Sequence, residues 1–115
     1  LKVAIPVGFE IQVRPRSGIS LRTKLRLSNS PGTIDSGYRD EICIIMSNVS
    51  PKESTETIRT LEKSNGGEGT YHIKCGDRLA QFVLARVPVI DFIETDDVES
   101  IGINRGGGFG STGHK

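Results

Sequence analysis

The chain has 115 residues, with 15 basic and 14 acidic side chains and a formal net charge of +1. This length suits one domain and leaves too few residues for a second core. The balanced charge excludes a polycation that would coat a nucleic-acid polymer or an anionic membrane. No apolar run approaches the roughly 20 residues that a membrane-spanning helix needs, so we expect a soluble protein.

The composition favours an all-β fold. Ile and Val together number 21, against 10 for Ala and Leu together, and β-branched side chains suit a pleated surface better than a helix. The two cysteines fit neither a dense disulfide framework nor a CxxC metal site. We therefore expect both to be reduced, in a cytoplasmic protein.

The first strand signal comes at once. Apolar and polar residues alternate over 9–14, which predicts a half-buried strand that stops at Pro15. Residues 16–20 are typical of a loop or a single helical turn, and Leu25 and Leu27 then resume the alternation. A chain that enters its strands so directly resembles the middle of a domain, so we expect an N-terminal segment to precede it.

A reversal with Pro and Gly follows at 29–38, and the apolar run 41–47 is interpreted as a buried strand. Together they predict a hairpin whose turn carries Asp35. Residues 50–70 hold few large apolar groups and are expected to form an excursion between strands, although a helix from Pro51 is possible. Strand signals return from residue 71.

The C-terminal stretch 105–113, RGGGFGSTG, suggests a phosphate clamp. Glycines let backbone N–H groups approach an anion, the Ser and Thr hydroxyls add donors, and Arg105 matches phosphate oxygens. The alternative is an unstructured tail, the usual outcome for glycine at a terminus. Phe109 favours the clamp, because a lone aromatic among glycines is placed to stack on a base.

Polar residues at two strand ends are further candidates. Arg16-Ser17-Gly18 places a guanidinium, a hydroxyl and a flexible N–H where the first strand stops, or is an ordinary strand-to-loop junction. Asp35 could serve as a general base for a water, or only cap an Asx turn. Asn29 could recognise the edge of a base, or be a second turn former. Neither histidine has a partner at ligand spacing, and we assign neither to metal or catalysis.

Four motifs in chain order resemble those of trimeric dUTPases, the dUTP diphosphatases: PRSG at 15–18, NSPGTIDSGYRDEI at 29–42, GDRLAQ at 76–81 and RGGGFGSTG at 105–113. The resemblance covers nearly the whole chain. It implies a distorted jelly-roll β-barrel of the β-clip type over residues 1–104, with 105–115 as a tail that closes the active site. It further implies a homotrimer whose sites draw motifs from three subunits, so that a monomer is inactive.

The implied reaction is Mg²⁺-assisted hydrolysis of dUTP to dUMP and pyrophosphate, which supplies dUMP and clears dUTP from the nucleotide pool. Asp35 would activate the water, Tyr38 would exclude a 2′-hydroxyl, and Phe109 would stack on uracil. By the resemblance, uracil would be read by Asn29 with Gly32, Thr33 and Ile34, and the phosphates held by Arg16, Ser17, Gly18, Gln81, Arg105, Gly110, Ser111 and Thr112.

Two departures from the family pattern leave other functions open. The family's first motif, Ala-Gly-x-Asp-Leu, whose Asp helps to hold Mg²⁺, has no counterpart here, so no residue is assigned as a metal ligand. Residues 51–69 look like an insertion. The alternatives are a catalytically impaired, nucleotide-gated regulator of the same fold and, as a weaker match, a relative of dCTP deaminase.

Overall fold

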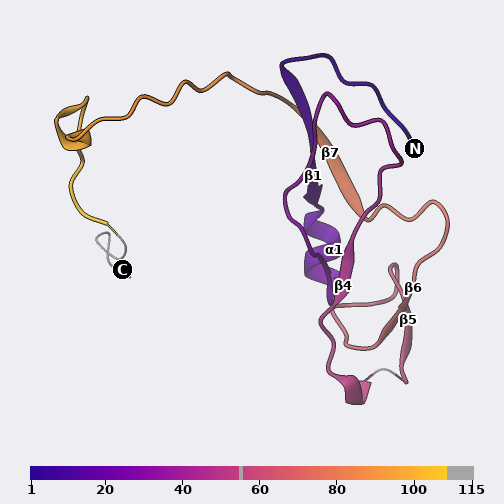
Figure 1. Cartoon of the computed structure of the whole chain (residues 1–115). Coiled ribbons are helices and arrows are strands. Elements are labelled where there is room, and N and C mark those ends of the chain that lie inside the picture. Colours follow the sequence, from indigo (N-terminus) through magenta and orange to yellow (C-terminus); the bar gives the residue numbers. More distant parts are fainter. Residues whose placement is uncertain (55, 109–115) are drawn as a thin grey trace.

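The protein is mostly β, as predicted (Figure 1). The computed structural model describes residues 1–54 and 56–108. Within them the elements in chain order are β1 (Phe9–Pro15), α1 (Ser17–Arg22), β2 (Leu25–Leu27), β3 (Gly32–Ile34), β4 (Met46–Asn48), the 3-10 turn η1 (Lys52–Ser54), β5 (Ile58–Thr60), β6 (Thr70–His72), β7 (Ala80–Arg86) and the 3-10 turn η2 (Val98–Ser100). No helix in these ranges is long and apolar enough to cross a membrane.

The main sheet has the order β3-β1-β7, with antiparallel pairing throughout. Ile11 in the central strand lies opposite Ile34 on one side and Leu84 on the other. Two smaller sheets are formed by β2 with β4, antiparallel, and by β5 with β6, parallel. The predicted alternation over 9–14 is present as β1. Of the two alternatives for residues 16–20, a loop or a single helical turn, the structure has a short helix, α1.

The predicted hairpin exists, but its turn is not tight. Its strands β2 and β4 pair, with Leu25 opposite Asn48 and Leu27 opposite Met46. Between them lies β3, which pairs with β1 instead. The expected strand 41–47 was wrong over most of its length, because only Met46–Asn48 is a strand. The preceding stretch is held by single backbone bonds, such as Ile42 N to the Leu1 carbonyl at 2.9 Å.

The core is small and lies against β1 and β3. Ile5, Val13 and Ile34 form its buried cluster, and Leu25 of β2 is buried separately. The chain has a radius of gyration of 20.2 Å, against about 13 Å for a compact chain of this length. The molecule is therefore elongated, and much of its apolar surface is left uncovered. Partly buried side chains complete the core: Val3, Phe9, Ile11, Leu27, Ile42, Ile44 and Ala80.

The C-terminal arm, residues 87–108, contributes most to this extended shape. It leaves the sheet at the end of β7 and runs away from the body of the molecule (Figure 1). All of its residues are exposed, including Phe92 at 92% and Ile103 at 101%. Exposed apolar side chains are therefore gathered on this one segment.

Candidate functional site

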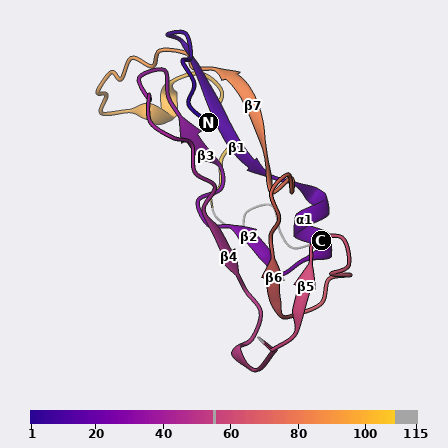
Figure 2. The same cartoon turned by 90° about the vertical axis from the view of Figure 1, so that its right-hand side faces the viewer.

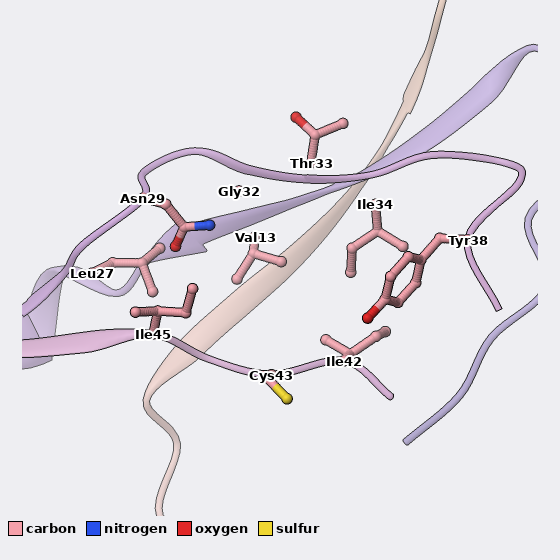
Figure 3. Close-up of a pocket in the computed structure, with 10 residues that line it drawn as sticks. All are labelled: Val13, Leu27, Asn29, Gly32, Thr33, Ile34, Tyr38, Ile42, Cys43 and Ile45. Atoms are coloured by element: carbon pink, nitrogen blue, oxygen red, sulfur yellow. The ribbon is translucent and has the colours of Figure 1, made fainter. Parts of the chain in front are cut away.

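An apolar pocket of about 200 Å³ opens beside β3 (Figure 3). It contains Asn29, Gly32, Thr33, Ile34 and Tyr38, all expected to bind uracil or deoxyribose. The remaining lining residues are Val13, Leu27, Ile42, Cys43 and Ile45. Seven of the ten lining residues carry largely apolar side chains, so the pocket suits a flat, weakly polar ring with a few edge contacts.

Strand pairing gives the apolar pocket its shape. Gly32 lies opposite Val13 in β1, and a Cβ at residue 32 would stand 3.3 Å from the Asn29 amide nitrogen and 3.4 Å from the Val13 Cβ. The Tyr38 hydroxyl donates a hydrogen bond to the Glu41 carbonyl at 2.8 Å, which fixes the direction of its ring. The glycine therefore keeps the floor of the pocket open, and the tyrosine forms a fixed wall.

Asp35 follows β3 directly and lies just outside the pocket lining. Its Oδ1 accepts a hydrogen bond from the Gly37 backbone N–H at 2.7 Å, and its carbonyl accepts one from the Tyr38 N–H at 3.2 Å. Asp35 therefore does cap an Asx turn. Among the described residues nothing donates to Oδ2 of this exposed carboxylate. A held carboxylate with one open oxygen can still accept a proton from a water.

A second hollow, the charged depression, has a volume of about 350 Å³ and lies beside α1. It contains the predicted Arg16 and Gly18, together with Arg22 and Arg78. Within the described ranges none of these three arginines forms an ion pair. The other lining residues are Ile19, Leu61, Glu62, Gly76 and Asp77. Three guanidinium groups with no ion-pair partner provide a site for an anion with several oxygens.

The two remaining phosphate candidates from this region lie next to the charged depression. Ser17 begins α1. The Gln81 side chain donates to the Pro15 carbonyl at 3.0 Å and so joins β7 to the end of β1, one residue before Arg16.

Asp35 and Arg16 stand at opposite ends of the β1–β3 pair. The register that places Ile11 opposite Ile34 brings Asp35 level with Glu10. Arg16 is six residues farther along, which at about 3.3 Å per residue is roughly 20 Å. One chain therefore does not bring the candidate base and the candidate phosphate ligands together.

Arg105 lies exposed in the C-terminal arm, next to the Gly106 N–H that donates to the Asn104 side chain at 2.8 Å. The other expected tail ligands, Phe109, Gly110, Ser111 and Thr112, lie outside the described residues.

The part of the chain that the structure describes contains no group of three His, Cys, Asp or Glu side chains able to hold a metal ion. Both cysteines are free and exposed, and Cys43 lines the apolar pocket.

Comparison with curated proteins gives consistent relatives. The chain is 41% identical over 112 residues to the deoxyuridine 5′-triphosphate nucleotidohydrolase of Caulobacter vibrioides, covering 96% of this chain and 60% of that protein. The corresponding protein of Chlamydia caviae is 42% identical over 117 residues, covering 100% of this chain and 68% of the relative.

The chain belongs to the dUTPase family. It spans about 60% of the length of the Caulobacter relative. No protein-family model matches it.

Solved dUTPase structures share the fold. A dUTPase of Staphylococcus bacteriophage 80alpha with dUpNHpp is 28% identical with a TM-score of 0.81, covering 98% of this chain and 72% of that one. A dUTPase from phage phi11 of S. aureus, described with a structural Mg(II) ion, is 28% identical with a TM-score of 0.69, covering 86% of this chain and 69% of that one.

Sequence reasoning missed residues in both hollows. Ile42 and Ile45 were interpreted only as strand residues, yet they line the apolar pocket. Arg22, Arg78 and Glu62 line the charged depression. Arg78 belongs to the GDRLAQ motif and could have been found there, whereas Glu62 comes from the 51–69 segment and carried no signal.

Proposed function

We propose that this dUTPase-family protein hydrolyses dUTP to dUMP and pyrophosphate. The observation that carries the proposal is the apolar pocket, in which all five residues expected to read uracil and deoxyribose lie together beside Asp35. Membership of a family whose relatives are named deoxyuridine 5′-triphosphate nucleotidohydrolases supports the same substrate.

The reaction is an in-line displacement at the α-phosphorus. Asp35 accepts a proton from a water while the water oxygen bonds to that phosphorus. The bond from the α-phosphorus to the bridging oxygen breaks, and pyrophosphate leaves with the bonding electron pair. Arg16 and Arg105 offset the negative charge of the phosphate oxygens, and Ser17, Gly18 and Gln81 orient the chain of phosphates.

Uracil and deoxyribose occupy the apolar pocket. The Asn29 amide and the backbone over 32–34 form hydrogen bonds with the edge of the base, and the Tyr38 ring lies under the sugar, where it rejects a 2′-hydroxyl. The tail then closes over the nucleotide, with Phe109 on uracil and with Gly110, Ser111 and Thr112 at the phosphates. Closure excludes bulk water and strengthens each electrostatic contact.

We further propose a homotrimer of jelly-roll β-barrels of the β-clip type, with residues 1–104 in the barrel and 105–115 in the tail. Three active sites are each completed by three subunits. The separation of Asp35 from Arg16 along β1 and β3 supports this arrangement, because one chain cannot supply both to one substrate. The exposed apolar residues of the C-terminal arm support it as well, since they need a neighbouring subunit to cover them.

Mg²⁺ is part of the proposal because this ion is usually bound by substrate phosphates with one or two carboxylates and several waters, rather than by an all-protein cage. The related phage phi11 dUTPase is described with a structural Mg(II) ion. A cytoplasmic location is supported by the free state of Cys43 and Cys75.

Pyrophosphate release from dUTP, dCTP, dTTP and UTP tests the function, with Asp35→Asn alongside the wild type. We expect release from dUTP alone. Asp35→Asn should lower turnover by roughly 10²- to 10⁴-fold while dUTP binding persists, because only the proton acceptor is lost.

Undiminished turnover in Asp35→Asn would show that Asp35 is not the base. Tight dUTP binding without any release by the wild type would favour a nucleotide-gated regulator, and release from dCTP would favour a deaminase-like pocket.

A further inference from the structure

The helix that carries the expected phosphate ligands is weakly held by its own residues. α1 spans only six residues, Ser17–Arg22, and none of them is buried. Arg16, at its N-cap, makes no side-chain capping hydrogen bond. So short a helix is not stable by itself. Its C-terminal end is held by the buried C-cap Thr23, whose hydroxyl donates to the Ile19 carbonyl at 2.6 Å, and by hydrogen bonds from the rest of the fold.

Those hydrogen bonds reach the C-terminal end of α1 from the 51–69 segment. The Ser64 hydroxyl and the Gly66 N–H both donate to the Arg22 carbonyl, the latter at 2.8 Å. This carbonyl is one of the terminal acceptors that a helix cannot satisfy internally. Ser64 is fully buried, at 0% exposure, whereas most of the 51–69 segment is exposed.

A second contact ties the same loop to Lys24, two residues beyond the end of the helix. The Tyr71 hydroxyl donates to the Gly67 carbonyl and accepts from the Lys24 N–H at 2.8 Å. We call residues 61–67 the brace loop. Figure 2 shows β5 and β6, which flank this loop, beside α1.

The brace loop also forms part of the charged depression. Leu61 and Glu62 line it opposite Arg16, Gly18 and Arg22. The segment that contacts the end of α1 is therefore also a wall of the hollow into which the phosphates of dUTP would bind.

We propose that the 51–69 segment braces α1 and that Ser64 is a positioning residue for the triphosphate. Ser64 touches no substrate. It holds the helix so that Arg16, Ser17 and Gly18 face the phosphates, whereas the apolar pocket, formed on β3 and β1, does not depend on it. This inference rests on the proposed function.

Ser64→Ala tests it, with Ser50→Ala as the matched control. The Ser50 hydroxyl bonds the same segment, donating to the Gly69 carbonyl at 3.2 Å and accepting from the Gly69 N–H at 3.0 Å, but it does not reach α1. Both variants remove one hydroxyl from the attachment of the segment. The measurement is the inhibition constant of dUpNHpp and of deoxyuridine against dUTP turnover by the full-length protein.

We expect Ser64→Ala to raise the dUpNHpp constant by roughly 3- to 10-fold, the effect of about one lost hydrogen bond. It should leave the deoxyuridine constant unchanged, and Ser50→Ala should change neither. A general loss of folded protein would lower the number of active sites without altering the ratio of the two constants.

The inference would be overturned if the ratio of the dUpNHpp and deoxyuridine constants were unchanged in a folded Ser64→Ala variant, or changed equally in Ser50→Ala. In either case, dUTP turnover by the wild type would leave the proposed function intact. Absence of dUTP turnover in the wild type would overturn both. Should Ser64→Ala not fold, Tyr71→Phe removes the other tie without disturbing the buried serine. A smaller rise in the dUpNHpp constant would then support the brace, and an unchanged ratio would refute it.

Discussion

The apolar pocket and the charged depression are built in different ways. The pocket lies on paired strands, against the buried Val13 and Ile34. The depression lies on a six-residue helix without a buried side chain and on loops that reach it through hydrogen bonds. The half that is expected to read the base is thus set by packing, and the half that is expected to hold the phosphates is set by polar contacts from a separate segment.

Asp35, just outside the pocket, and Arg16, in the depression, also lie at opposite ends of β1 in one chain. In the proposed homotrimer, Asp35 of one subunit and Arg16 of another would act on the same substrate. The largest predicted effect is therefore the loss of nearly all activity when every subunit lacks either residue, and its partial return when different subunits supply the two.

Co-assembly of two inactive variants tests the separation. Asp35→Asn and Arg16→Ala should each be nearly inactive alone. Random trimers of the two should recover about a quarter of wild-type activity, because in a closed oligomer that fraction of shared sites receives an intact Arg16 from one subunit and an intact Asp35 from another.

The control is a mixture that cannot exchange subunits, which should remain inactive. Recovery in that control, or none after co-assembly, would contradict shared sites. The measurement is pyrophosphate release normalised to trimer concentration.

Truncation after Glu99 tests what the tail contributes to nucleotide hydrolysis at the apolar pocket and the charged depression. Turnover should fall by roughly 100-fold, because the bound nucleotide would stay open to water and lose the Arg105 contact. The trimer should persist, since six of the eight large apolar side chains that the arm exposes precede Glu99 and are retained. Sedimentation and pyrophosphate release check the two statements, and full activity of the truncated chain would remove the tail from the mechanism.

The smallest predicted effects are those of single substitutions in the tail, which should distinguish contacts with the base from contacts with the phosphates. Phe109→Ala should weaken both deoxyuridine and dUpNHpp binding by roughly 1 to 3 kcal/mol, since stacking on a base is lost in each case. Arg105→Ala should weaken dUpNHpp alone, because deoxyuridine has no phosphate. Dissociation or inhibition constants of both ligands, measured for both variants, check this pattern. Equal losses of affinity in all four measurements would contradict it.

The sequence predicted well where the pattern is local. The alternation over 9–14 predicted β1, and Pro15 predicted where it ends. For the residues that follow, the sequence left a loop or a single helical turn open, and the structure has α1. The resemblance of four motifs gave the family. Five of the ten residues that line the apolar pocket lie within 29–38, so one motif brought half of the lining to the same place.

The remaining features depend on contacts between distant segments. Gly32 to Ile34 contain too few residues to signal a strand, and β3 forms only because β1 provides a partner. Glu41 to Ile45 belong to an apolar run that is typical of a buried strand, yet β4 begins only at Met46, where β2 provides a partner. Ser64 shows nothing in the sequence that distinguishes it from other loop serines, since its role comes from the Arg22 carbonyl 42 residues away.

The exposed C-terminal arm also has a consequence for the stability and solubility of single chains in the proposed homotrimer. Val89, Phe92 and Ile103 are each more than nine-tenths exposed. A chain that covers such residues only by meeting others of its kind has a stability linked to protomer concentration. Its melting temperature should rise with concentration, and dilute, newly made chains should aggregate more readily than assembled ones.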